Sequence, residues 1–158
     1  MKNLRYIIAV IAGIFCLASA SAKTHEIPFE KGRLVVTPLQ DNAVRIKYVE
    51  GEVAELPELI YVSNGEGVSC KMTTKGDKTV FKLKGMTVTA DRSNGIIEVT
   101  DRNGEKVFSA LAHELKNGTV QGEPTREAKL VIDSPEDEYI YGLGQFQDGY
   151  LNVRGLTR

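Results

Sequence analysis

The residues best suited to chemistry lie in the last stretch of this 158-residue chain, YIYGLGQFQDGYLNVRGLTR, from Tyr139 to Arg158. Aromatic side chains are mixed there with glycines, amides and a carboxylate. Glycines let a backbone come close to a ligand, and aromatics beside polar groups suit the mixed apolar and hydroxyl faces of a sugar. The central candidates for ligand contact are Gln145, Phe146, Gln147 and Asp148. The alternative is that Tyr139 and Tyr141 pack one face of a strand, while the glycines only permit a sharp turn.

Other catalytic arrangements find little support. A hydrolase that works through two carboxylates needs them on facing elements, about 5–10 Å apart. Asp91, Glu98 and Asp101 flank predicted hairpins, so we expect turn and solvent-facing residues there. The run Glu136–Glu138 follows Pro135 and is typical of a solvated loop. No Gly-x-Ser-x-Gly motif is present. We therefore assign no catalytic residue.

Metal and cofactor sites are not predicted either. His25 and His113 are the only histidines, and no histidine or cysteine pair has the spacing of metal ligands. His25 falls in an N-terminus that we expect to be frayed, and His113-Glu114 in an irregular segment. Cys70 lies in a pattern that places it on the apolar face of a strand, where a free cysteine behaves as a small hydrophobic residue. We expect no metal ion and no cofactor.

The N-terminus has the pattern of an export signal. Lys2 and Arg5 precede an apolar core, Tyr6–Leu17, that is short for a bilayer span, and small residues at 18–22 offer cleavage sites. A retained N-terminal anchor is the alternative. Removal of residues 1–22 leaves 136 of the 158 residues, one domain that is exported to the periplasm or beyond and has no stable membrane span. Its scattered charges provide no basic surface for nucleic acid.

Hydrophobic residues in the remaining chain recur with the period of β-strands. Predicted strands cover residues 33–38, 43–49, 59–62, 68–74, 79–83, 86–91, 96–100, 106–110, 128–132 and 139–143. Between them stand Gly76-Asp77, Asn94-Gly95 and Asn103-Gly104, which tolerate the positive φ of tight hairpin turns. Residues 51–58 and 110–115 are only weakly helix-like. Residues 23–158 are therefore predicted to form one all-β antiparallel sandwich.

Two motifs in this order resemble the N-terminal domain of family 31 glycoside hydrolases, which include secreted α-glucosidases and α-xylosidases. They are MTVTADRSNGIIEVTDRNG (Met86–Gly104) and Tyr-Gly-Leu-Gly at 141–144. The resemblance implies a galactose mutarotase-like β-sandwich that is incomplete at its C-terminus, packs against a following (β/α)₈ barrel and sends a loop to the rim of the sugar pocket. The aspartate nucleophile and acid/base of that family belong to the barrel, so no residue of this chain inherits a catalytic role.

Within the resemblance, the four candidate residues acquire roles. Phe146 is expected to stack on a pyranose ring and Asp148 to accept hydrogen bonds from hydroxyl groups. Gln145 stands where many members have glutamate, and its neutral amide can both donate and accept. The implied partners are a carbohydrate substrate and the downstream barrel, and the chain alone is expected to be inactive. If the sandwich is severed, we expect an unpaired strand edge and an exposed apolar patch.

Two other functions remain open. A stand-alone carbohydrate-binding or adhesion module would bind sugar without any further domain, although the chain has no tryptophan. A mutarotase-type epimerase needs a positioned acid/base pair such as histidine with glutamate. Only His113-Glu114 offers such a pair in the sequence, and adjacent residues of a strand point to opposite faces.

Overall fold

The computed structural model describes residues 24–53, 68–142, 144 and 149–157. These residues form nine β-strands and no helix. One sheet has three strands, β1 (His25–Phe29), β2 (Gly32–Gln40) and β3 (Ala43–Val49). The other has six, β4 (Lys71–Lys75), β5 (Lys78–Lys82), β6 (Met86–Asp91), β7 (Ile96–Asp101), β8 (Lys106–Val120) and β9 (Glu123–Ile132). Within each sheet, consecutive strands pair antiparallel, which confirms the predicted all-β antiparallel fold.

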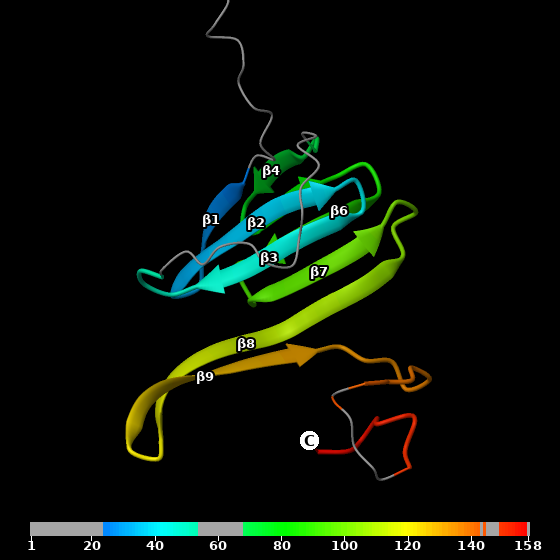
Figure 1. Cartoon of the computed structure of the whole chain (residues 1–158). Helices are drawn as coiled ribbons and strands as arrows, with labels where there is room; N and C mark the ends of the chain where they lie inside the picture. The colour runs from blue at the N-terminus through cyan, green and yellow to red at the C-terminus, as the bar shows by residue number, and fades with distance from the viewer. Residues whose placement is uncertain (1–23, 54–67, 143, 145–148, 158) are drawn as a thin grey trace, which may run out of the picture.

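The two sheets pack on each other. In Figure 1 the three-stranded sheet lies in front of β4 and β6, while β7 and β8 continue the larger sheet beyond β3. Alternate residues of the strands point between the sheets, because side chains alternate across a strand. Leu34 and Val36 of β2 and Phe81 of β5 are fully buried there. The core between the sheets consists of Ile27, Phe29, Leu34, Val36, Phe81, Val88, Ala90, Ile97, Val99 and Ala110. Burial of this apolar surface is the main force that holds the sheets together.

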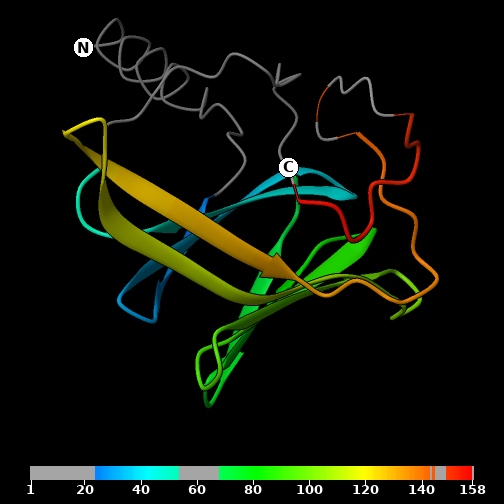
Figure 2. The same cartoon turned by 90° about the horizontal axis from the view of Figure 1, so that it is seen from below.

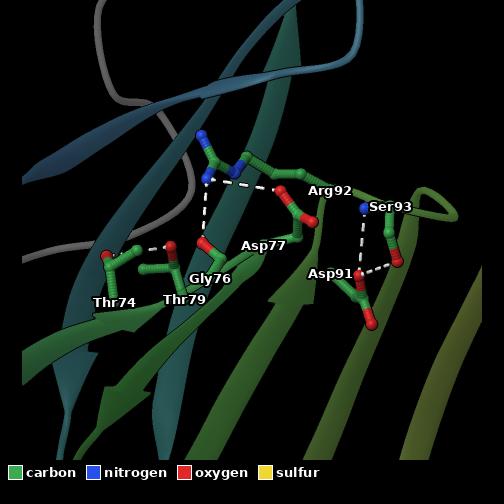
Figure 3. A network of polar contacts seen from close by, with 7 residues as sticks. All are labelled: Thr74, Gly76, Asp77, Thr79, Asp91, Arg92 and Ser93. Carbon is green, nitrogen blue, oxygen red and sulfur yellow. Dashed lines mark hydrogen bonds and ion pairs between the residues drawn. The ribbon is translucent and has the colours of Figure 1, made fainter.

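The predicted turns lie where the sequence placed them, and polar side chains fasten two of them to each other (Figure 3). Arg92 Nη2 donates to the carbonyl oxygen of Gly76 at 3.0 Å and lies 3.7 Å from Asp77 Oδ1. The Arg92 backbone N–H donates to Asp77 O at 2.9 Å. The β4–β5 turn and the β6–β7 turn are thereby tied together at one end of the sheet.

The ionised carboxylate of Asp91 makes hydrogen bonds at this end of the sheet, so the stability of this end depends on pH. Its Oδ1 accepts hydrogen bonds from the Ser93 hydroxyl at 2.6 Å and the Ser93 backbone N–H at 3.0 Å, and Lys78 Nζ lies 3.5 Å from Oδ2. The hydrogen bonds from Ser93 are the main cause, followed by the charge of Lys78, of a pKa of Asp91 that lies below its usual 3.8. The side chain is buried rather than solvent-facing as the sequence predicted.

We expect the melting temperature to fall as pH decreases below the unfolded value of 3.8 for Asp91, since the folded state binds this proton less readily than the unfolded state. The contribution of Asp91 is fully present above that pH and is lost as pH falls through the lower folded pKa. Asp91→Asn should therefore flatten the acid side of a plot of melting temperature against pH, measured by circular dichroism. An acid side identical to that of the wild-type chain would contradict this assignment.

The strand bounds differ most from the prediction in four places. β9 begins at Glu123 rather than at residue 128. Residues 25–29, expected to be frayed, form β1, and residues 110–115, expected to be irregular, lie in the long strand β8. Residues 139–142, expected in a strand, contain none. The predicted strand at 59–62 and the predicted signal at 1–22 lie outside the described residues. No helix in the described part is long and apolar enough to cross a bilayer.

The β8–β9 hairpin extends beyond the other strands as an arm (Figure 2). Its base is joined to the sandwich through pairing of β8 with β7 at residues 106–110. A register shift between Ala110 and Ala112 marks the point where the arm leaves the core. From there to the tip most side chains on both strands are exposed.

Candidate functional site

The segment that follows β9 carries the predicted sugar site, and its two ends are pinned together. The Val153 backbone N–H donates to Ile140 O at 2.8 Å. Asn152 Oδ1 accepts from the backbone N–H of Ile140 at 3.0 Å and of Arg154 at 3.1 Å. Val153 itself is buried at 5% exposure. These contacts form the neck of a loop whose ends meet, as in the Ω-loops that often carry function.

Arg154 ties this neck to the chain just after β9. Its Nη1 donates to the Ser134 hydroxyl oxygen and its Nη2 to the Ser134 carbonyl oxygen at 3.1 Å. A longer contact of 3.4 Å joins Nη1 to the carbonyl oxygen of Glu138. One guanidinium therefore satisfies acceptors from two stretches of backbone, a task that suits its planar fork of donors.

We expect Arg154→Ala to loosen the neck without unfolding the sandwich. Hydrogen bonds from a charged donor are worth about 1.5–3 kcal/mol each at most, so local opening should become about tenfold or more frequent. Amide hydrogen exchange at Val153 reports this directly, since that N–H closes the neck. The matched control is Arg102→Ala, an exposed arginine in the β7–β8 turn. Unchanged exchange at Val153 in the Arg154 variant would show that the guanidinium does not hold the neck.

Exposed aromatics line the described part of the loop. The rings of Tyr139 and Tyr141 stack with centroids 6.3 Å apart and an angle of 10° between their planes. They are 66% and 58% exposed, and Tyr150 is 65% exposed. The alternative prediction, that Tyr139 and Tyr141 pack one face of a strand, is therefore wrong. The four residues predicted to contact sugar, Gln145, Phe146, Gln147 and Asp148, lie outside the described residues.

A second site, which the sequence did not reveal, is an apolar cleft of about 570 Å³ between the two sheets. Half-buried side chains of β3, Val44, Ile46 and Tyr48, line one wall. Phe108 and His113 of β8 are on the opposite wall. The cleft is open rather than enclosed by the described residues, and Leu130 of β9 stands at its margin.

His113 provides the polar end of this cleft. Its Nε2 lies 2.9 Å from Glu30 Oε2, close enough for an ion pair, although the two groups are not aligned as a hydrogen bond. The ring is stacked on Phe29 at 5.4 Å and meets Tyr48 edge-on at 4.2 Å. The imidazole is only 7% exposed. The histidine predicted in a loop is thus a buried link between the sheets, and its acidic neighbour in space is Glu30 rather than Glu114.

Two close contacts hold this cluster in place. The Tyr48 hydroxyl donates to Glu50 Oε1 at 2.8 Å. Burial of the phenol, as the larger cause, and the hydrogen bond to Glu50, as the next, raise the pKa of Tyr48 to about 12. The phenol therefore stays protonated and keeps donating at ordinary pH. Gly95 has φ of 73°, and a Cβ there would stand 2.2 Å from Glu30 Oε1. A side chain at this position would strain the backbone and force the Glu30 carboxylate to move away from the β6–β7 turn.

The chemistry of this cluster is limited by its burial. An acid/base pair needs to reach a substrate, whereas the imidazole is enclosed by Phe29, Tyr48 and Glu30. Cys70 also packs against the core, and burial raises the pKa of its thiol. In the described ranges no three histidine, cysteine, aspartate or glutamate residues come close enough to hold a metal ion. The cluster is best explained as a link between the sheets.

No known family model matches the chain. Its fold matches that of a GH31 α-xylosidase from Xanthomonas citri with a TM-score of 0.72 and 23% sequence identity, over 84% of this chain and 15% of that one. A GH31 α-xylosidase from a soil metagenome, solved with xylose, matches with a TM-score of 0.68 and 19% identity, over 85% of this chain and 23% of that one. The chain thus spans less than a quarter of these enzymes. The predicted resemblance to part of a family 31 hydrolase is confirmed at the level of the fold.

Proposed function

We propose that this chain is the non-catalytic N-terminal β-sandwich of an exported retaining α-glycosidase, an α-xylosidase or α-glucosidase that acts on oligo- or polysaccharides. The observation that carries the proposal is the shared fold, which extends over 84% of this chain but only 15% of the Xanthomonas citri enzyme. A sandwich of this size supports a catalytic barrel and leaves the catalytic aspartates to it. Export follows from the N-terminal pattern of basic and apolar residues.

The loop between Ile140 and Val153 is proposed to reach the rim of the sugar pocket. A pinned neck fixes where the loop starts and ends, and the exposed Tyr139 and Tyr141 rings offer apolar faces nearby. Gln145 and Gln147 would contact hydroxyl groups, Phe146 would stack on a pyranose ring and Asp148 would accept hydrogen bonds. These roles suit sugars because each pyranose has both apolar faces and polar edges.

The purified chain is expected to show no turnover of aryl α-xylosides or α-glucosides, because the residues that would attack and protonate the glycosidic bond are proposed to lie in the barrel. Release of nitrophenol, followed by absorbance, measures this directly. Reproducible turnover that scales with protein concentration would contradict the proposed non-catalytic role. The coding DNA past the codon for Arg158 gives the positive test: an open reading frame for a strand and helix repeat would supply the barrel.

A stand-alone sugar-binding module is the second candidate, and the stacked pair Tyr139 and Tyr141 favours it. An exposed pair of parallel rings is a platform on which sugars can stack. Calorimetry of the chain with xylo- and gluco-oligosaccharides distinguishes the two functions. Saturable binding that Tyr141→Ala abolishes would favour the module, and absence of binding would favour a loop that needs the barrel.

A further inference from the structure

The outer strand of the β8–β9 arm is an exposed edge. Within the described residues β9 pairs with β8 alone. Leu130, Val131 and Ile132 are 56%, 36% and 49% exposed. A long edge strand with exposed apolar residues is a template for another strand. The opposite edge of the same sheet, β4, is only five residues long and has a lysine at each end, a common protection against such pairing.

The hairpin turn determines which backbone groups of β9 face outward. Gln121 and Gly122 have φ of 52° and 88°, as in a two-residue hairpin loop, so Val120 and Glu123 form the hydrogen-bonded closing pair. Hydrogen-bonded and non-hydrogen-bonded pairs then alternate along the hairpin. The outward N–H and C=O groups therefore belong to the even-numbered residues Arg126, Ala128 and Leu130. Pro124, which has no N–H to offer, fits an outward position.

Among two-fold axes centred on residues 126 to 129, the charges on β9 favour one way in which the strand can pair with itself. With a two-fold axis at Ala128, the outward N–H and C=O groups of one β9 meet those of the other. Glu127 of each copy then lies opposite Lys129 of the second copy, which gives two pairs of opposite charge. Shifting the axis to Glu127 or to Lys129 places like charges opposite each other, and an axis at Arg126 sets two guanidinium groups face to face. Cross-strand pairs of opposite charge stabilise a sheet and like charges destabilise it.

The same register satisfies the neighbouring side chains. Leu130, 56% exposed, lies opposite Arg126 of the second copy, whose aliphatic stem can cover it. Val131 lies opposite Thr125, a good cross-strand pair of β-branched residues. Neither Glu127 nor Lys129 has an ion-pair partner among the described residues. Both charges are thus available to a second copy.

We propose that two copies of this chain associate through antiparallel pairing of β9 with β9, with the two-fold axis at Ala128. The two six-stranded sheets become one continuous sheet across the dimer. Such an interface is isologous, because each surface meets itself, and it closes at two copies. The inference rests on the edge strand and its charges, and it needs no sugar-binding role for this chain.

Sedimentation equilibrium of the purified chain tests the proposal. The wild-type chain is expected to form a dimer in a concentration-dependent equilibrium. Lys129→Glu turns two attractive pairs into repulsive ones, as does Glu127→Lys, so each should raise the dissociation constant at least about tenfold. The double variant Glu127→Lys with Lys129→Glu restores opposite charges across the axis and should restore the dimer.

The matched control is Lys75→Glu, which makes the same change of charge at the opposite edge strand and should leave the dissociation constant unchanged. Within the monomer Glu127 lies opposite Lys116 and Lys129 opposite Glu114, so each charge change also affects the hairpin. Thermal unfolding followed by circular dichroism therefore first checks that the four variants fold like the wild-type chain. A wild-type chain that stays monomeric at its highest soluble concentration would overturn the proposal. A dimer that the single variants do not weaken, or that the double variant does not restore, would overturn it equally.

Discussion

Replacing Phe81 by alanine is expected to lower the free energy of unfolding by about 3–5 kcal/mol, the usual cost of removing a buried aromatic ring. Phe81 of β5 is fully buried, opposite Val88 of β6, and its ring lies 5.8 Å from that of His25 in the other sheet. The ring therefore fills space between the two layers, and its loss leaves a cavity that neither sheet can close by itself. Urea denaturation followed by circular dichroism measures the change.

Val107→Ala is the control for this experiment. Val107 is also apolar and lies in a strand, but it is 66% exposed, so its truncation should change stability by less than about 0.5 kcal/mol. If the two variants were equally stable, the Phe81 ring would not fill the space between the two sheets as described.

Gly32→Ala is expected to cost roughly 1–3 kcal/mol, because a methyl group there has no space. A Cβ at Gly32 would lie 2.2 Å from the carbonyl oxygen of Val49, and the nearest obstacle is therefore backbone of β3 rather than a movable side chain. Either β2 or β3 must shift, which disturbs pairing beside the β1–β2 turn. The same denaturation measurement detects the loss.

Gly118→Ala in β8 is the matched control. Its Cβ would meet only the Glu127 side chain, at 3.1 Å, and that carboxylate can move away. A strand glycine without this constraint weakens the sheet, so alanine there should be neutral or slightly stabilising. Equal losses at the two glycines would mean that general strand propensity, rather than the close approach of Val49, determines the effect.

Local signals predicted much of the six-stranded sheet. Asn94-Gly95 and Asn103-Gly104 lie in the turns on either side of β7, and Gly76-Asp77 joins β4 to β5, because these residues permit the backbone conformations that the turns require. The alternation at 43–49 marked β3 with its observed bounds. These turns and this strand depend on a few consecutive residues, so they can be predicted from the sequence alone.

Signals that depend on distant residues were missed. β1 contains Pro28 and few β-branched residues, and it forms because Ile27 and Phe29 complete the core beside β2. The part of β8 beyond Ala110 lacks a regular apolar period, because most of its side chains are exposed and its best buried side chain, His113, is polar. The contact of Glu30 with His113 joins residues far apart in the chain, and no local sequence pattern predicts it.

The sugar contacts predicted at Gln145, Phe146, Gln147 and Asp148 stay a prediction, since these residues lie outside the described part of the chain. Tyr139 and Tyr141, predicted in a strand, are exposed and lie in none. What the sequence could not supply is the neck, since Arg154 and Asn152 act through backbone groups of Ser134, Glu138 and Ile140 rather than through a motif. Polar residues that satisfy backbone acceptors have no fixed spacing.

The pairing of consecutive strands within each sheet has a consequence for how the chain acquires its structure. Each ladder closes a short connection, from two residues at Gly76-Asp77 to four at 92–95, so little chain entropy is lost before contacts form. Such local pairing favours rapid formation of each sheet, whereas contacts between the sheets, such as His25 with Phe81, join distant parts of the chain. Within a sheet, strands can also assemble in the order in which they emerge during synthesis, and each strand after the first finds its partner already present.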